Sequence, residues 1–375
     1  MRALGWLALL AGVAPLSAQM TPAYRVAVVS ESGDIITFLK PQGGTLVVEK
    51  VVPVGIMPAD IDGPHNIAVA PDGKSYYVTI AHGVPFGSLW RFDAKTDAVL
   101  GKAQVDMFPT TIAITPDGDF AFVANSDFHG DHPATNPVSI IHTPTMTKIT
   151  DLPACDMPHG VKSNHAGTFV YVSCMNSDEI LELDTGTFSI SRRAKIGKGH
   201  SMAAMDHSKM AMPATAPATG SSPAPAENYL AKECAGTFVS VSADDKTLYV
   251  ACNYGNEVQV WDAEKLTLMK EIPVGTGAYN VEPSPDGSVI IVTNKKAQSF
   301  SIIDAKTFVE LARIPTTKKI VHGIAYSPDS KYAYITQESI GSDPGAIDVV
   351  DLTTRKVTGT VPIPAQPTGI TILRQ

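Results

Sequence analysis

The stretch "YNVEPSPDGSVIIVTNK", residues 279–295, contains the pattern that decides the fold. Apolar and polar residues alternate on both sides of a Ser-Pro-Asp-Gly turn, and a period of two predicts β-strands rather than helices. Asp and Gly in a short link between two such segments favour a tight antiparallel turn. The stretch therefore predicts a β-hairpin.

The same hairpin pattern occurs six times along the chain. The copies start at His65, Thr110, His159, Gly236, Tyr279 and His322. Their turns lie at positions 72, 117, 166, 244, 286 and 329, which are 45, 49, 78, 42 and 43 residues apart. A third and a fourth strand are expected after each hairpin. A period in the forties with four strands per unit is typical of a β-propeller blade.

A seventh blade is split between the two ends of the chain. "YRVAVVSES" at 24–32 matches a second strand with no first strand before it, and "PTGITILRQ" at 367–375 matches a first strand with no hairpin after it. Pairing the two closes the ring and leaves no open sheet edge. The predicted fold is all-β: a seven-bladed β-propeller of four-stranded antiparallel blades over residues 19–375.

The first 18 residues predict export. Met1-Arg2 is followed by a short apolar run and by the small residues Ser17-Ala18, the pattern of a secretory signal peptide (1–18); a retained N-terminal anchor is the alternative. The remainder holds 28 basic and 37 acidic residues, a net charge of −9, which disfavours nucleic acid as a partner. We expect a periplasmic or secreted monomer without a membrane span after cleavage.

The ends of the second strands carry a family resemblance. "YVTI" (77–80), "YVSC" (171–174), "YVAC" (249–252) and "IVTN" (291–294) resemble the YVTN-repeat family of seven-bladed propellers, over nearly all of the mature chain. The resemblance implies an exported propeller and leaves the function open. Propellers of similar architecture include bacterial lactonases, amine dehydrogenase subunits and the domain of nitrous-oxide reductase whose inner-strand histidines hold a copper cluster.

The 78-residue gap contains an insertion at about 199–227, "GHSMAAMDHSKMAMPATAPATGSSPAPAE". Thioether sulfur and imidazole nitrogen together suit copper. The candidate ligands in this segment are His200, Met202, Met205, His207, Met210 and Met212. The segment also resembles the Met/His-rich loops of periplasmic copper-handling proteins. A low-complexity insert without a metal role is the alternative.

Six more histidines are expected at one end of the channel. In a propeller the start of each first strand and the turn between strands two and three lie on the same face, here called the top face. His65, His159 and His322 start first strands, and His82, His129 and His132 lie in such turns. The pattern predicts a metal or small-molecule site, with copper as the expected cofactor and zinc also open. Channel-lining histidines that bind only water are the alternative.

The four cysteines predict two matching disulfides. Cys155 and Cys234 precede first strands, while Cys174 and Cys252 end the second strands of the same blades. Extending the hairpin pairing places Cys174 opposite a position near 157 and Cys252 opposite one near 237. An oxidising compartment then favours the pairs 155–174 and 234–252. Pairing between blades and thiolate ligation of a metal are the alternatives.

These patterns predict a function without deciding whether the protein is an enzyme. The first hypothesis is a copper-binding or copper-handling propeller that uses the insertion and the top-face histidines. The alternatives are a lactonase-like or lyase-like enzyme, an oxidoreductase subunit with a periplasmic protein partner, and an interaction scaffold. Glu338 and other top-face acids are expected to be ordinary turn residues, and Lys295 and Lys296 either bind an anion or keep the rim soluble.

Overall fold

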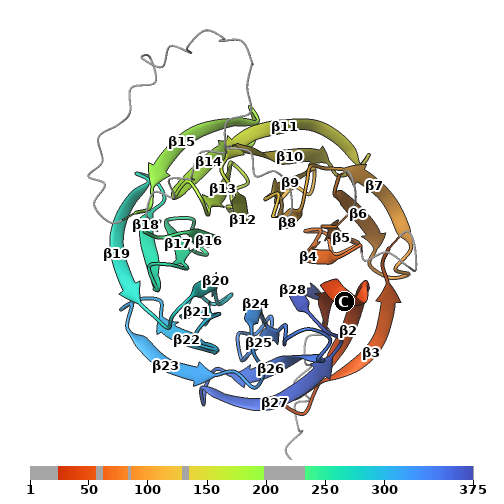
Figure 1. Cartoon of the computed structure of the whole chain (residues 1–375), viewed down its shortest axis with the longest axis vertical. Helices are drawn as coiled ribbons and strands as arrows, with labels where there is room; N and C mark the ends of the chain where they lie inside the picture. The colour runs from red at the N-terminus through yellow and green to blue at the C-terminus, as the bar shows by residue number, and fades with distance from the viewer. Residues whose placement is uncertain (1–23, 56–61, 83–85, 129–134, 198–232, 375) are drawn as a thin grey trace, which may run out of the picture.

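The computed structural model describes residues 24–55, 62–82, 86–128, 135–197 and 233–374. Seven four-stranded antiparallel sheets form a ring around a central channel, which confirms the predicted propeller (Figure 1). The one helix in these ranges is a 3-10 turn at Glu31–Gly33. No helix in the described ranges is long and apolar enough to cross a membrane.

The innermost strand of each blade is named first here. The blade that joins the chain ends holds β28 (Pro367–Arg374), β1 (Tyr24–Ser30), β2 (Ile35–Gln42) and β3 (Thr45–Pro53). The next two blades hold β4 (Pro64–Val69), β5 (Ser75–Ile80), β6 (Ser88–Asp93) and β7 (Val99–Gln104), and β8 (Pro109–Ile114), β9 (Phe120–Asn125), β10 (Asn136–His142) and β11 (Thr147–Cys155).

The fourth and fifth blades flank the 198–232 segment. They hold β12 (Pro158–Ser163), β13 (Phe169–Cys174), β14 (Glu179–Asp184) and β15 (Ser189–Lys195), and β16 (Gly236–Val241), β17 (Thr247–Cys252), β18 (Glu257–Asp262) and β19 (Thr267–Pro273). The last two hold β20 (Ala278–Pro283), β21 (Val289–Asn294), β22 (Ser299–Asp304) and β23 (Glu310–Pro315), and β24 (Val321–Tyr326), β25 (Tyr332–Gln337), β26 (Gly345–Asp351) and β27 (Lys356–Ile363).

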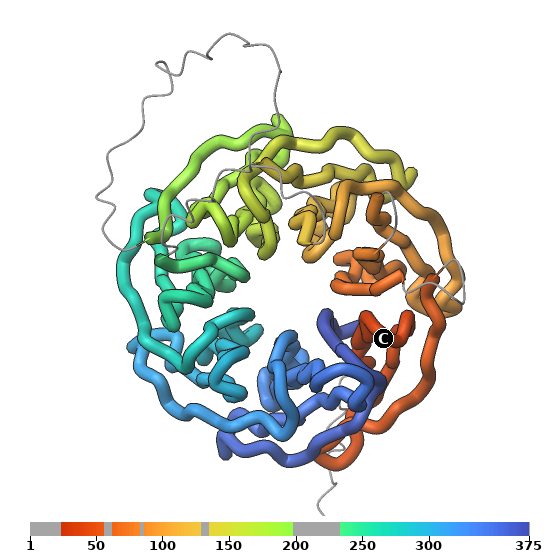
Figure 2. The backbone as a smooth tube through the Cα atoms, in the orientation of Figure 1, coloured from red at the N-terminus to blue at the C-terminus, as the bar shows by residue number. Residues whose placement is uncertain are grey.

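The two chain ends close the ring as predicted. β28 pairs antiparallel with β1, with Ile372 opposite Val26, and β1 pairs with β2. In Figure 2 the blue C-terminal strand lies beside the red N-terminal strands. Because every sheet is complete, its apolar faces pack against the two neighbouring blades. One such cluster joins Ile80 and Trp90 to Phe38 of the adjacent blade. Each fully buried side chain of this size stabilises the fold by about 2 kcal/mol.

Each innermost strand begins with a β-bulge near its second residue. In the β4–β5 pair, Pro64 lies opposite Ile80 and Asn66 lies opposite Thr79, so His65 is the extra residue. The same one-residue shift occurs in the other six first hairpins. A bulge re-aims side chains and breaks the local ladder of backbone hydrogen bonds.

A buried hydroxyl group repairs the broken ladder. The amides of Asn66, Gly160, Asn280 and Gly323 donate to the hydroxyls of Thr79, Ser173, Thr293 and Thr336 at 2.9, 3.1, 3.0 and 2.7 Å. These hydroxyls are the third residues of "YVTI", "YVSC", "IVTN" and "YITQ". The repeated tetrapeptide therefore has a structural reason: its third residue caps the bulge.

The same hydroxyls join each blade to the next. Ser173, Thr293 and Thr336 donate at 3.1 Å to first-strand carbonyls of the following blade, those of Thr237, His322 and Thr368. Where the second strand carries Ala124 or Ala251 instead, Thr110 and Thr237 of the first strand supply the hydroxyl toward the next blade. Thr368 likewise donates to the His65 carbonyl at 2.7 Å. At least one hydroxyl thus crosses each of six of the seven junctions between blades.

Both predicted disulfides are confirmed. Cys155 is bonded to Cys174 and Cys234 to Cys252. Cys174 lies opposite Pro158 and Cys252 opposite Gly236, each within one residue of the predicted position. All four thiols are consumed, so the alternatives of pairing between blades and of thiolate ligation are wrong. Two disulfides indicate an oxidising compartment.

Replacing the bulge-capping hydroxyl tests this account. Thr293→Val leaves the amide of Asn280 and the carbonyl of His322 without their partner. We expect the free energy of unfolding to fall by about 2 kcal/mol, because unpaired buried polar groups keep their desolvation cost. Thr293→Ser is the matched control, since it removes only a methyl group, worth about 0.8 kcal/mol. Urea unfolding followed by circular dichroism measures both, and equal losses in the two variants would contradict the role of the hydroxyl.

Candidate functional site at the channel mouth

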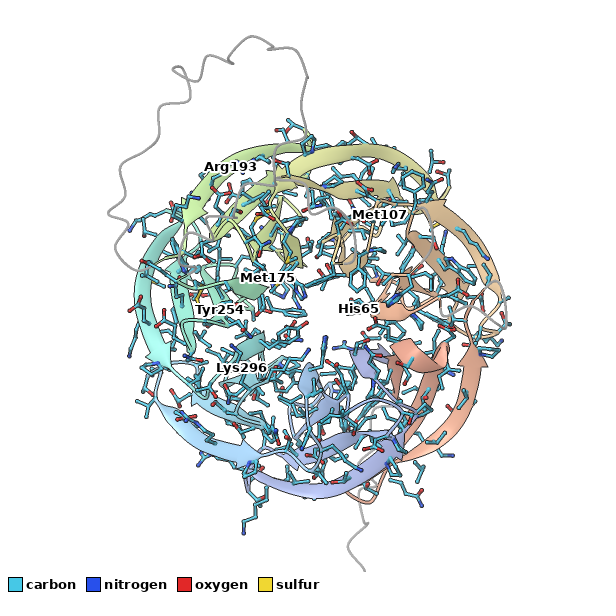
Figure 3. The ribbon with its side chains drawn as sticks, in the orientation of Figure 1. His65, Met107, Met175, Arg193, Tyr254 and Lys296 are labelled. Atoms are coloured by element: carbon cyan, nitrogen blue, oxygen red, sulfur yellow. A yellow bond between two sulfur atoms is a disulfide. The ribbon has the colours of Figure 1, made fainter. Side chains whose placement is uncertain are left out.

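The top-face end of the channel holds a closed circle of six side-chain rings, here called the mouth ring. Successive centroids are separated by 5.8 Å (His65–His322), 4.8 Å (His322–Tyr279), 5.6 Å (Tyr279–His159), 5.8 Å (His159–Phe128), 5.1 Å (Phe128–Phe108) and 5.4 Å (Phe108–His65). Every pair meets edge-on, the geometry that ring quadrupoles favour. Figure 3 shows His65 at the edge of the central channel. The mouth ring therefore encircles the top-face end of the channel.

The bulges place both the second and the third residue of a first strand at the channel. In a regular strand, consecutive side chains point to opposite faces. Here Tyr279 belongs to the mouth ring, while its neighbour Asn280 lines the channel below. The predicted starting positions of His65, His159 and His322 are confirmed, since each is the second residue of its strand.

The residue before each first strand adopts a left-handed backbone conformation. These residues are Gly63, Phe108, Met157, Ala235, Gly277, Ile320 and Gln366, with φ between 49° and 73°. Five are not glycine, and Ile320 is β-branched, for which a positive φ is rare. Each such residue costs about 1–2 kcal/mol. The left-handed turn at Phe108 also brings its ring into the mouth ring. Non-glycine residues with positive φ also precede the fourth strands, at Met146, Phe188, Leu266, Phe308 and Arg355, so this conformation belongs to the repeat and does not mark the mouth.

A buried carboxylate binds two of the predicted histidines. Glu31 lies in the 3-10 turn after β1, is 5% exposed, and contacts His65 Nδ1 at 2.9 Å and His82 Nε2 at 2.6 Å. Burial alone would raise the pKa of Glu31, but the two imidazoles outweigh it and hold that pKa well below 4.5. The hydrogen bond that His82 donates to Glu31 raises the pKa of His82 above 6.5. A charged pair therefore occupies this side of the mouth.

A second ion pair lies beside the mouth ring. Lys295 Nζ is 2.8 Å from Glu338 Oε1 and 4.1 Å from the centroid of the Tyr279 ring. His322 Nε2 is 3.9 Å from the same carboxylate oxygen. Burial opposes the charge of Lys295, but Tyr279 and Glu338 outweigh it and raise the pKa of the ammonium. Burial raises the pKa of the Tyr279 hydroxyl and, together with Lys295, lowers that of His322. At neutral pH Lys295 is charged, Tyr279 keeps its proton and His322 is neutral.

His159 is buried in its neutral form. Its Nδ1 lies 2.8 Å from the Thr237 carbonyl, so the hydrogen-bond network assigns the proton to this nitrogen. The Tyr279 hydroxyl lies 3.3 Å from Nε2, which accepts. Burial lowers the pKa of His159 to about 3. This histidine orients Tyr279 and carries no charge at neutral pH.

The described residues of the mouth ring do not bring three metal ligands together. Within the described ranges, no three His, Cys, Asp or Glu side chains could hold a metal ion together. Tyr279 lies between His159 and His322, and Glu31 occupies His65. Ligation of one ion by the three histidines stays a prediction.

Eight other predicted ligands cannot be placed. His129, His132, His200, Met202, Met205, His207, Met210 and Met212 lie outside the described residues.

Glu31, Lys295 and Glu338 occupy the same position of the repeat, which can be recognised in the sequence. Lys295, Glu338 and Glu31 are each the first residue after a second strand, in three consecutive blades, and His82 follows at the next position in the fourth. The sequence analysis missed Glu31 and expected Glu338 to be an ordinary turn residue. Comparing this one position across blades identifies the charged half of the mouth.

Comparison with known proteins shows the fold. No family model matches the sequence, and no curated protein sequence does, so the YVTN resemblance is not shown by a family match. A functionally unknown protein from Desulfotomaculum acetoxidans is similar with a TM-score of 0.71 and 13% identity, over 94% of this chain and 99% of that one.

Two similar structures have described activities. The periplasmic gluconolactonase of Pseudomonas aeruginosa has a TM-score of 0.69 and 16% identity, over 93% and 99% of the two chains. A chain of Kuenenia stuttgartiensis hydrazine synthase has a TM-score of 0.64 and 20% identity, over 84% and 93%. At these identities the likeness shows a shared propeller fold alone.

Glu31→Gln tests the first ion pair. Because the pKa of Glu31 is lowered, the stabilisation of the fold by the Glu31–His82 pair is present above pH 4.5. It is lost as the pH falls through the pKa that Glu31 has in the folded protein. Because the pKa of His82 is raised, the stabilisation of the fold by protonated His82 is present below pH 6.5. It is lost as the pH rises through the pKa that His82 has in the folded protein. We expect the free energy of unfolding of the Glu31→Gln variant to fall most between pH 4.5 and pH 6.5. We also expect the pKa of His82 in this variant to return toward 6.5. NMR titration of the His82 ring checks this, and an unchanged His82 pKa contradicts it.

Proposed function

We propose that this protein is an exported enzyme that performs acid–base chemistry on a small carbonyl compound at the channel mouth, as lactonases and lyases do. The observation that carries the proposal is the contact of Lys295, Glu338, Tyr279 and His322. Four titratable groups of different charge, gathered in a nearly dry site, are typical of catalysis. A purely structural channel lining does not need them.

Three of the four groups have a role that their protonation states support. Lys295 has a side chain that is 26% exposed, so it is the member a ligand meets first. Its positive charge and the Tyr279 hydroxyl polarise a carbonyl oxygen. Neutral His322 accepts a proton from water as the water oxygen bonds to the carbonyl carbon. In a lactone the ring C–O bond then breaks, and the proton passes to the leaving oxygen to give a hydroxy acid.

The structural neighbours agree with this class of function. The gluconolactonase acts on a lactone and shares the propeller architecture. Likeness of fold alone does not transfer an activity, so the proposal depends on the four side chains.

Turnover of a panel of lactones tests the proposal. We expect Lys295→Met and Tyr279→Phe to lower kcat/KM by about 10²–10⁴-fold, the usual contribution of a positioned acid or base. His142→Ala, on β10 away from the mouth, is the control and should leave turnover unchanged, as should deletion of residues 199–227. Full activity in folded Lys295→Met would reject these roles, and no turnover of any lactone would reject this substrate class.

Copper binding through the insertion is a second proposed function. The spacing of His200, Met202, Met205, His207, Met210 and Met212 favours it, because a chain with ligands one to three residues apart can surround one ion. Metal capture by the insertion does not require the mouth ring, whose described residues do not bring three metal ligands together. The two proposed functions are therefore separable.

Elemental analysis of protein purified from the periplasm tests the copper proposal. We expect copper in the full chain and a loss of most of it when residues 199–227 are deleted. His65→Ala is the comparison variant for the rim, and should keep the metal if the insertion supplies the ligands. Equal copper with and without the insertion would reject the insertion as the source, and no copper in either would reject copper binding.

A further inference from the structure

A cavity lies in the channel on the other side of the mouth ring from Lys295. It has a volume of about 410 Å³, and residues from all seven innermost strands line it. The lining begins at Phe238 and His322 and follows the first strands toward the face opposite the mouth, where Arg374 lies. The volume is in the range of small-molecule sites.

One polar atom of the lining has no protein partner. Within the described part of the chain, Asn280 Oδ1 makes no hydrogen bond, whereas the His322 ring bonds to the Thr368 backbone. Asn280 is 7% exposed. Buried polar atoms are nearly always paired, and an unpaired one costs free energy. A bound molecule with a hydroxyl group would supply the missing partner.

Among the described lining residues, the inner end of the cavity holds no charged side chain that would favour an anion, since Lys162, Glu282 and Arg374 lie farther along the first strands. Lys162 Nζ contacts both carboxylate oxygens of Glu282 at 2.9 Å, a pair that joins β12 and β20 past the intervening β16. This ammonium is therefore already neutralised. The inner end of the cavity presents amide groups of Asn66 and Asn280, the imidazole of His322, and the apolar ring of Phe238.

We propose that this cavity binds a neutral, cyclic, polyhydroxylated small molecule. One of its hydroxyls bonds to Asn280 Oδ1, and one apolar face of its ring packs on Phe238. The site lies on the far side of the mouth ring from Lys295, and binding there requires no proton transfer. The proposal therefore goes beyond the proposed enzyme function and does not depend on it, although His322 borders both sites.

The test is calorimetric titration of the full chain with myo-inositol, which has no carbonyl group and cannot be a substrate of the proposed hydrolysis. We expect measurable binding and at least an approximately tenfold weaker affinity in Asn280→Gly, because a hydrogen bond to the ligand is lost. Glycine occupies the same register at Gly160, Gly323 and Gly369, so the fold tolerates it. Should Asn280→Gly not fold, Asn280→Thr is the second variant, because threonine occupies the equivalent position of another blade at Thr111.

Controls make the result decisive. His142→Ala should bind myo-inositol as the unaltered chain does. Absence of myo-inositol binding at millimolar concentrations, or equal affinity in the folded Asn280 variant, overturns the site. D-gluconate tests the ligand class, since tighter binding of this anion than of myo-inositol overturns the assignment of a neutral ligand.

Discussion

The structure depends on buried hydroxyls that cross six of the junctions between neighbouring blades. Thr293 shows how they work: its hydroxyl accepts from the Asn280 amide and donates to the His322 carbonyl of the following blade. One side chain thus satisfies a bulged strand and connects two sheets. Two blades carry alanine at this position, and there a threonine on the first strand supplies the hydroxyl toward the next blade. The bulge can be kept because its polar groups are paired.

The bulge in turn determines what the channel presents. It directs Tyr279 into the mouth ring and Asn280 into the cavity below, although the two residues are adjacent in the chain. The mouth ring then separates two environments. Ion pairs and a partly exposed lysine lie at its top-face side, and uncharged amides and an apolar ring lie at the inner end of the channel. Low local polarity strengthens each paired charge and makes each unpaired group costly.

The charged half of the mouth has a chemical consequence. Glu31, His82, Lys295 and Glu338 come from four consecutive blades, and each charge has an opposite partner. The four side chains therefore stay charged in a nearly dry site, and their positive and negative charges balance. The neutral His159 and His322 lie beside them, so a proton donor and a proton acceptor are in contact at neutral pH. This arrangement supports acid–base chemistry, whereas ligation of a metal by His65 and His159 would have to displace Glu31 from the first and Tyr279 from the second.

The sequence by itself determined the repeat, the number of blades, the closure by the chain ends, the two disulfides and the top-face positions of His65, His159 and His322. Each of these follows from local alternation or from a fixed register within one hairpin. Only the tertiary structure decided which side chains meet. Glu31 and His82 are 51 residues apart, and Tyr279 is 120 residues from His159. Such contacts arise from the bulges and from the packing of one blade on the next, and the repeat alone does not say which side chains of different blades meet.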